Sequence, residues 1–262
     1  MSFQGLTIQD LRACKGKRQL AYVQVARDEE AIAAAEAGMD MIGTAFLPER
    51  AHFARLAKGA HFQFGLPWGK HACATEALRD AMAAMQAGAQ SVYCGMSPNV
   101  VEVLSREGVP VICHVGLVPP KATWTGGFRA VGKTPVQARD VLRQVRDFEN
   151  AGAFAVELEV VPENLAAAIT RRSGMLTLSL GSGGGCDAQY LFSADLLGEN
   201  RGYIPRHAKA YRNFAAERDR LQAERVAAYR EFIADVVDGR FPEQSQVVRM
   251  DGAVLDDALK DF

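Results

Sequence analysis

Three stretches of the sequence repeat one pattern, in which an alanine-rich segment runs into an Ala-Gly pair and then into a short apolar or β-branched run. They are "AIAAAEAGMDMIGTAF" from Ala31, "AMAAMQAGAQSVYCGM" from Ala81 and "DFENAGAFAVELEVV" from Asp147. The glycines at positions 38, 88 and 152 stand where the end of a helix needs a residue in the left-handed conformation. The repeated unit is therefore helix, tight turn and strand, which predicts a parallel sheet with helices outside it.

Eight candidate strands follow one another along the chain, with helical patterns between most of them. They cover residues 19–25, 39–46, 61–67, 91–96, 109–117, 153–161, 175–183 and 189–194. Eight such units in a chain of 262 residues predict a (β/α)8 TIM barrel. A doubly wound sheet is the alternative, but no G-x-G-x-x-G motif follows the first strand.

The domain organisation follows from the same pattern. No low-complexity linker divides the chain, so residues 1–262 are predicted to form a single barrel domain. Residues 206–237 are charged and helical in pattern, and we interpret them as a C-terminal helical extension with a solvated face. Such an extension could close the barrel or contact a partner subunit, and a homo-oligomer is expected.

Composition excludes several classes of function. Lys and Arg number 30 and Asp and Glu 31, so the net charge of −1 argues against a nucleic-acid or membrane-surface role. The five cysteines are scattered without a C-x-x-C pair, which argues against a zinc site or a disulfide framework and suits a reducing cytoplasm. Neither a secretory leader nor a membrane span is expected, because no apolar run of about 18 residues occurs.

Polar residues stand near the C-terminal ends of the predicted fifth and sixth strands, where barrel enzymes place their active sites. His114 lies on the fifth strand, and Glu157 and Glu159 share one face of the sixth. The loop "GSGGGCDAQ" (181–189), which contains Ser182, can present backbone N–H groups to an anion. Three alternatives stay open: a buried core role for His114, solvent-facing or arginine-paired glutamates, and a plain flexible turn at the loop.

Several segments of the second half together resemble the ketopantoate hydroxymethyltransferase family. They are "CHVGLVPP…GGFRAVGK", "AGAFAVELEVVPENLAAAIT", "LSLGSGGGCDAQYLFSADLLG", "YIPRHAKAY" and "GRFP". The likeness is dense over residues 109–242 and thin before them.

The resemblance implies a (β/α)8 barrel of the phosphoenolpyruvate/pyruvate-binding superfamily. The family reaction transfers a hydroxymethyl group from methylenetetrahydrofolate to the enolate of a branched 2-oxo acid, with magnesium as the Lewis acid. Glu159 falls on the acid/base glutamate of the family, and His114 falls on the histidine that contacts the bound 2-oxo acid.

The first half departs from the family motifs. Ala45, Gly65 and Gly95 stand where the family has two aspartates and a glutamate around the metal, and Tyr93 replaces a lysine. Alanine and glycine side chains offer magnesium no oxygen ligand, so we predict no metal site of the family kind. Magnesium and methylenetetrahydrofolate remain the expected cofactors only if the family reaction is kept. Without a cation beside it, Glu159 is expected to have a raised pKa.

The primary hypothesis is an enzyme that makes or breaks a carbon–carbon bond next to the carbonyl of a small 2-oxo acid. Glu159 would move the proton and His114 would stabilise the oxyanion, with Tyr93 as a further donor and Glu157 and Ser182 as substrate contacts. One alternative is an authentic 3-methyl-2-oxobutanoate hydroxymethyltransferase of pantothenate biosynthesis with an unusual metal site. Another is a non-catalytic barrel, in which Phe46, Trp68 and Tyr93 fill the pocket.

Overall fold

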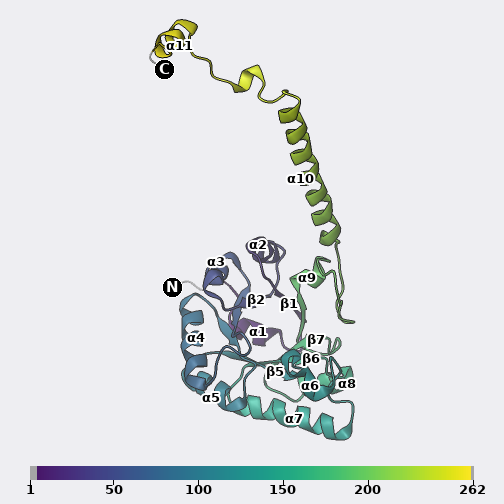
Figure 1. The fold of residues 1–262 in the computed structure, drawn as a ribbon. Coiled ribbons are helices and arrows are strands. Elements are labelled where there is room, and N and C mark those ends of the chain that lie inside the picture. Colours follow the sequence, from purple (N-terminus) through teal and green to yellow (C-terminus); the bar gives the residue numbers. More distant parts are fainter. Residues whose placement is uncertain (1–4, 261–262) are drawn as a thin grey trace. The chain divides into compact units, whose positions relative to one another are not determined.

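The computed structural model describes residues 5–260, and its first unit, which ends at Arg212, is built on a closed barrel of eight parallel strands (Figure 1). The strands are β1 (Leu20–Gln24), β2 (Met41–Ala45), β3 (His61–Gly65), β4 (Ser91–Tyr93), β5 (Val111–Gly116), β6 (Ala155–Glu159), β7 (Leu176–Leu180) and β8 (Ala188–Phe192). Each strand pairs with the next, and β8 pairs with β1 to close the barrel. The predicted fold class is confirmed, and only β8 begins outside its predicted range, by one residue.

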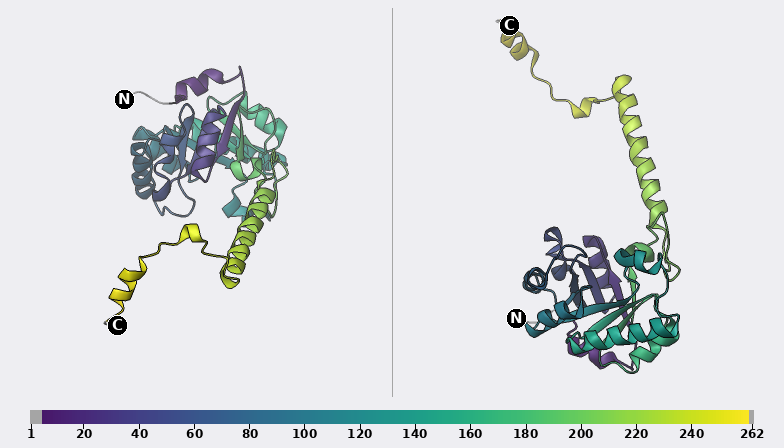
Figure 2. Two further views of the ribbon diagram at one scale, coloured as in Figure 1. Left: turned by 90° about the horizontal axis from the view of Figure 1, so that it is seen from above. Right: turned by 60° about the horizontal axis from the view of Figure 1, so that its bottom comes forward.

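Helices surround these strands, as the views of Figure 2 show for this unit. They are α1 (Ile8–Cys14), α2 (Asp28–Glu36), α3 (Phe53–Leu56), α4 (Ala74–Gln86), α5 (Pro98–Arg106), α6 (Ala122–Thr125), α7 (Pro135–Asn150), α8 (Glu163–Thr170) and α9 (Ser193–Leu196), with 3-10 turns η1 (Pro48–Arg50) and η2 (Pro119–Lys121). Gly38, Gly88 and Gly152 have φ values of 79°, 105° and 89° directly after α2, α4 and α7. The repeated Ala-Gly pair therefore ends a helix in each unit, as the sequence predicts.

Alternation along the strands separates two apolar layers. On β3, Phe62 and Phe64 point outward and pack under the helices, whereas His61 and Gln63 point into the barrel. Apolar side chains of β2, β5, β7 and β8 fill much of the interior, including Met41, Ile112 and Leu178. The eight strands carry no lysine or arginine, and their only acidic residues are Glu157 and Glu159.

A buried carboxylate holds the N-terminal end of the barrel together. Asp187, just before β8, accepts hydrogen bonds from the Thr177 backbone N–H (2.9 Å) and the Thr177 hydroxyl (3.0 Å). The Lys15 ammonium, directly after α1, completes the set with an ion pair of 2.7 Å. Asp187 thus joins three segments that are far apart in the sequence.

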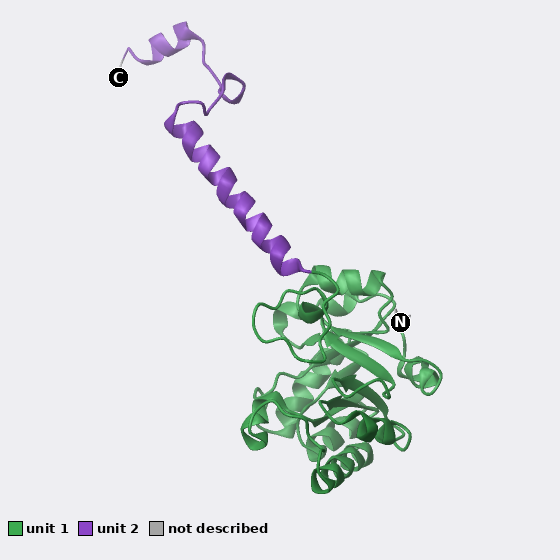
Figure 3. Ribbon diagram, turned by 90° about the vertical axis from the view of Figure 1, so that its right-hand side faces the viewer, with its two compact units in different colours: residues 1–212 green, residues 213–262 purple. Residues whose placement is uncertain are grey.

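The second unit, residues 213–262, contains α10 (Phe214–Val237), η3 (Gln244–Gln246) and α11 (Gly252–Ala258) (Figure 3). The predicted helical extension at 206–237 is thus a helix only from residue 214, after the Asn213 side chain caps the Ala216 N–H. The role of the extension in closing the barrel or contacting a partner subunit stays a prediction. In the part of the chain that the structure describes, no helix has the length and apolarity needed to cross a membrane.

Candidate active site

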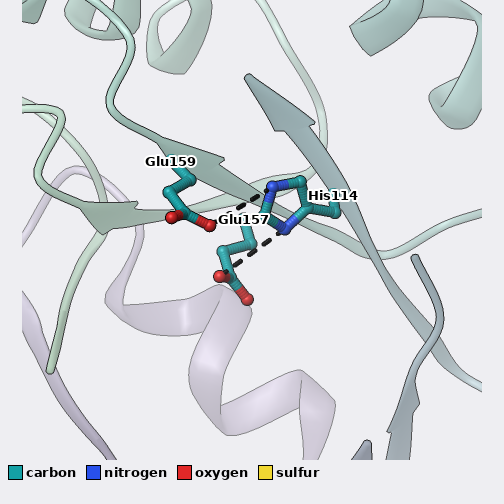
Figure 4. Close-up of side chains that lie close together, drawn as sticks. All are labelled: His114, Glu157 and Glu159. Carbon is teal, nitrogen blue, oxygen red and sulfur yellow. Dashed lines mark ion pairs between the residues drawn. The ribbon is translucent and has the colours of Figure 1, made fainter. Parts of the chain in front are cut away.

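Three side chains meet inside the barrel, at the C-terminal ends of two neighbouring strands (Figure 4). In the β5–β6 pairing His114 lies opposite Glu157, and Gly116 lies opposite Glu159. The Nδ1 atom of His114 is 3.6 Å from a Glu157 carboxylate oxygen, and its Nε2 atom is 3.6 Å from an oxygen of Glu159. The expectation that the side chains of His114 and Glu159 lie close together is confirmed, but of the two only Glu159 lines the cavity described below.

The backbone around this cluster has unusual conformations. Gly116 has a φ of 111°, and a Cβ at this position would lie 2.3 Å from the Glu159 carbonyl oxygen, so only glycine fits where β5 passes the end of β6. Val160, directly after Glu159, has a φ of 51°, which is rare for a β-branched residue. Strain of this kind costs about 1–3 kcal/mol and concentrates at functional sites.

The hydrogen bonds of His114 define its charge and tautomer. Its Nε2–H donates to the carbonyl oxygen of Leu117 at 2.6 Å, because a carbonyl can only accept. Nδ1 is therefore the acceptor, and the Tyr93 hydroxyl donates to it at 3.0 Å. Burial lowers the pKa of His114 to about 4, so the ring is neutral at physiological pH. His114 supplies no positive charge to hold either glutamate ionised.

Both carboxyl groups of the cluster bind protons more tightly than an exposed glutamate. Burial raises the pKa of Glu159 to about 7, and a rise caused by the loss of a neighbouring cation stays a prediction. Burial, with the neighbouring charge of Glu159 as the second cause, raises the pKa of Glu157 well above its usual value. A carboxyl group that titrates near neutral pH can both accept and release a proton during a reaction.

Two other predicted substrate contacts differ in their surroundings. Tyr93 contacts the cluster through His114, as expected for a group of the site. Ser182 is buried, and its hydroxyl donates to the Leu158 carbonyl and accepts from the Val161 N–H, so it fastens the β6 end to the loop after β7. A substrate contact by Ser182 stays a prediction without support from this geometry.

The glycine-rich loop after β7 has a packing reason for its composition. A Cβ at Gly181 would lie 2.6 Å from the His207 ring, and one at Gly183 would lie 2.4 Å from the Glu163 side chain. Both glycines also have positive φ values. Close approach of neighbouring segments therefore explains these two glycines, and anion binding by the loop backbone stays a prediction.

The sequence alone did not indicate the cavity that opens beside Glu159. Its volume is about 1000 Å³, and its walls come from residues 117–137, the ends of β6 to β8 and residues 203–207. Three basic side chains line it: Arg129, Lys133 and Arg206. These residues lie within the motifs "GGFRAVGK" and "YIPRHAKAY". The lysine and arginine residues in these two motifs are the signal that could have indicated a positively charged cavity.

Of the three aromatic residues that would fill the pocket of a non-catalytic barrel, Phe46 and Trp68 do not line the cavity beside Glu159, whereas Tyr93 lies beside Gly65 and Gly95 at the strand ends. Phe46 packs on Phe64 with ring centroids 5.0 Å apart, and Trp68 is 58% exposed. Deeper in the barrel, Tyr22 stacks on Tyr190 and accepts a hydrogen bond from Gln63. The Gln63 side-chain oxygen is buried without a hydrogen-bond partner.

The residues at the ends of β2 to β4 do not fit the magnesium site that the family resemblance implies. Ala45 lies opposite Gly65, and Gly65 lies opposite Tyr93, so no carboxylate is available there. The Tyr93 side chain lies beside both glycines, since a Cβ at Gly65 would be in ordinary contact with its ring at 3.6 Å and one at Gly95 would be crowded by its hydroxyl at 3.1 Å. Among residues 5–260, His114, Glu157 and Glu159 are the group whose ligand atoms come within 4.8 Å of one another. Both nitrogens of His114 already have hydrogen-bond partners, and magnesium prefers oxygen ligands.

Comparisons with known proteins agree with the fold and show the family. The family description "Ketopantoate hydroxymethyltransferase" matches residues 44–244. The chain is similar to the 3-methyl-2-oxobutanoate hydroxymethyltransferase of Deinococcus radiodurans, with 41% identity over 197 residues that cover 73% of this chain and 67% of the relative. The enzyme of the same name from Thermotoga neapolitana is 31% identical over 266 positions, covering 92% of this chain and 96% of the relative.

Solved structures show the same fold at low identity. A phosphonopyruvate hydrolase in complex with oxalate and Mg++ superposes with a TM-score of 0.54 at 13% identity, covering 98% of this chain and 99% of the other. A 2,3-dimethylmalate lyase of the PEP mutase/isocitrate lyase superfamily gives 0.51 at 13% identity, covering 98% of each chain. With the barrel, the cluster at its strand ends and the matching relatives taken together, the chain belongs to the ketopantoate hydroxymethyltransferase family of enzymes.

Proposed function

We propose that the chain makes or breaks a carbon–carbon bond next to the carbonyl of a 2-oxo acid, with Glu159 carrying the proton at the reacting carbon. The observation that carries this proposal is the position of Glu159. Its carboxyl group borders the cavity, is mostly buried and has a pKa of about 7. A base with a pKa near the working pH is the most effective one for removing a proton beside a carbonyl.

The bond-forming direction needs two steps. The Glu159 carboxylate takes the proton from the carbon next to the carbonyl, the C–H electron pair becomes a C=C bond, and the carbonyl π pair moves to oxygen. The enolate oxygen pair then re-forms the carbonyl, and the C=C pair makes the new bond to the electrophilic carbon of a one-carbon C=O or C=N group. The π pair of that group moves to its oxygen or nitrogen, which takes up a proton. Bond cleavage follows the same steps in reverse and returns the proton from Glu159.

The developing enolate oxygen needs a donor, and His114 has an N–H group in the cluster. Its Nε2 atom lies 3.6 Å from Glu159. In this proposal the Nε2–H group exchanges the Leu117 carbonyl for the enolate oxygen, while the Tyr93 hydroxyl keeps Nδ1 unprotonated. We also propose that the reaction proceeds without the magnesium site of the family, because positions 45, 65 and 95 carry no ligand atoms.

The curated relatives favour a second candidate, namely the reaction for which they are named. A relative that matches 92% of this chain carries the name 3-methyl-2-oxobutanoate hydroxymethyltransferase. The substrates would then be 3-methyl-2-oxobutanoate and methylenetetrahydrofolate. Both candidates share proton removal by Glu159 and differ in substrate and metal.

Proton exchange tests both candidates without a one-carbon donor. In D2O, the enzyme is expected to exchange the hydrogen next to the carbonyl of 3-methyl-2-oxobutanoate or of another 2-oxo acid, as followed by proton NMR. We expect exchange in EDTA at the same rate as with added magnesium. Exchange that appears only with magnesium favours the named reaction and contradicts the metal-free proposal. If a panel of 2-oxo acids shows no exchange under either condition, the proposed function is wrong.

We also infer a cytoplasmic homo-oligomer. The five cysteines are free, which suits a reducing compartment. Multi-angle light scattering of the full chain tests the assembly, and a monomer across the concentration range would contradict it.

A further inference from the structure

The cavity beside Glu159 is lined by charges of one sign apart from that glutamate. Arg129, Lys133 and Arg206 line it, and Glu159 is its only acidic lining residue. Within the described residues, none of the three basic side chains forms an ion pair or a side-chain hydrogen bond. Three cations around one cavity repel each other and create a positive potential there.

Two separate segments bring these cations together. Arg129 and Lys133 lie in the loop between α6 and α7, and Arg206 lies in the segment after α9. The Gln137 side-chain oxygen accepts a hydrogen bond from the Lys133 backbone N–H at 3.2 Å, which holds that part of the loop against the start of α7. The cations that line the cavity therefore come from two segments that are far apart in the sequence.

Outside the cavity lining, Lys121 of η2 lies close enough to His114 to lower its pKa, and it is a further cation near the cluster. The eight strands carry no lysine or arginine, and His114 is neutral. Tyr93 occupies the strand position where the family resemblance implies a lysine. An anionic ligand whose carbon reaches Glu159 must find its counter-charge in the surrounding loops.

We propose that Arg129, Lys133 and Arg206 bind a carboxylate of the ligand whose reacting carbon lies at Glu159. The position of the reacting carbon at Glu159 rests on the proposed function. The binding of the carboxylate by the three cations does not. Guanidinium and ammonium groups form charge-assisted hydrogen bonds with carboxylates. The carboxylate could be the one next to the carbonyl or a second one at the far end of a longer 2-oxo acid, and the experiment separates these sources.

The cavity also contains a built-in reporter of binding. Trp124 lines it and is 90% exposed, together with the partly exposed rings of Phe128 and Tyr203. The chain has two tryptophans, so a Trp68→Phe background leaves Trp124 as the sole indole fluorophore. A ligand in the cavity is expected to change its emission.

The test is a fluorescence titration of the full chain carrying Trp68→Phe, with and without Glu159→Gln. The probes are 3-methyl-2-oxobutanoate, its uncharged methyl ester and the dicarboxylate 2-oxopentanedioate. We expect Arg129→Gln, Lys133→Gln and Arg206→Gln each to raise the Kd of the bound acid about tenfold, the effect of losing a hydrogen bond to a charged group. Arg139→Gln, an exposed arginine of α7 outside the cavity, is the matched control and should leave the Kd unchanged.

Comparing the three probes shows which carboxylate of the ligand is recognised. If the Kd of the methyl ester for the Trp68→Phe chain is as high as its Kd for the cation variants, the carboxylate beside the carbonyl is the one recognised. If 2-oxopentanedioate binds more tightly than the monocarboxylate and loses that advantage in the variants, the remote carboxylate is recognised. Equal Kd values for the three variants, the control and the parent would overturn the proposal. Charge-dependent binding in a chain that shows no proton exchange would refute the proposed function alone.

Discussion

Replacing Glu159 by glutamine is expected to lower kcat by about 10²-fold or more, the usual contribution of a general acid or base. Glutamine keeps the size of the side chain but can neither take nor return a proton. In the wild type the rate should rise with pH through about 7, as Glu159 ionises, and this limb should vanish in the variant. Proton exchange measured by NMR at several pH values gives both results, and Glu107→Gln, on the surface after α5, is the control.

The same substitution has a consequence for stability that a purely catalytic measurement misses. The pKa of Glu159 is about 7 in the folded chain and near its ordinary value of 4.5 in the unfolded one. Between these values the folded state binds more protons, so its free energy of unfolding falls as the pH rises. Urea titrations from about pH 5 to 8 should show the wild type losing stability relative to Glu159→Gln. Parallel curves across that window would contradict the raised pKa.

Replacing Asp187 by alanine is expected to destabilise the fold by about 3 kcal/mol, the lower end of the cost of breaking a buried ion pair, because the Lys15 side chain left behind is 27% exposed. The carboxylate is 6% exposed, and its loss leaves the Thr177 N–H without an acceptor and the Lys15 ammonium without its counter-charge. Asp187→Asn keeps an acceptor of the same size and should cost less.

Urea unfolding measures the loss of stability as a lower midpoint concentration, provided that the dependence of the unfolding free energy on urea concentration is unchanged. Asp147→Ala, which removes an exposed carboxylate of α7, is the control and should change stability by less than about 0.5 kcal/mol. Because Asp187 lies at the N-terminal end of the barrel, the folded Asp187→Asn variant should keep near-normal activity. A large loss of activity without a loss of stability would contradict this structural role.

The barrel could be predicted because its information is local. Each Ala-Gly pair ends one helix and starts one strand, and the repetition fixes the topology. The meeting of His114 and Glu159 was predictable for the same reason, since residues at the ends of consecutive strands are neighbours in a closed parallel barrel.

Features that depend on loops were not predictable. The Lys15–Asp187 pair spans 172 residues, and no periodicity in the sequence encodes it. Arg129 and Arg206 line one cavity only because two loops without regular structure end near each other. The start of the C-terminal helix was predicted too early, at residue 206. The Tyr211 N–H instead donates to the Leu196 carbonyl, which commits that stretch to the first unit.

The space taken by the Tyr93 side chain restricts the mutational routes open to this chain. A side chain at position 95 would crowd the Tyr93 hydroxyl, because its Cβ would lie 3.1 Å away, whereas a Cβ at position 65 would be in ordinary contact with the Tyr93 ring at 3.6 Å. An acidic side chain at position 95 is therefore expected to need a smaller or more flexible residue at position 93, so the effects of changes at these two positions depend on each other. A library that varies positions 45, 65, 93 and 95 and is screened for folded protein should recover acidic residues at position 95 in combination with a change at position 93.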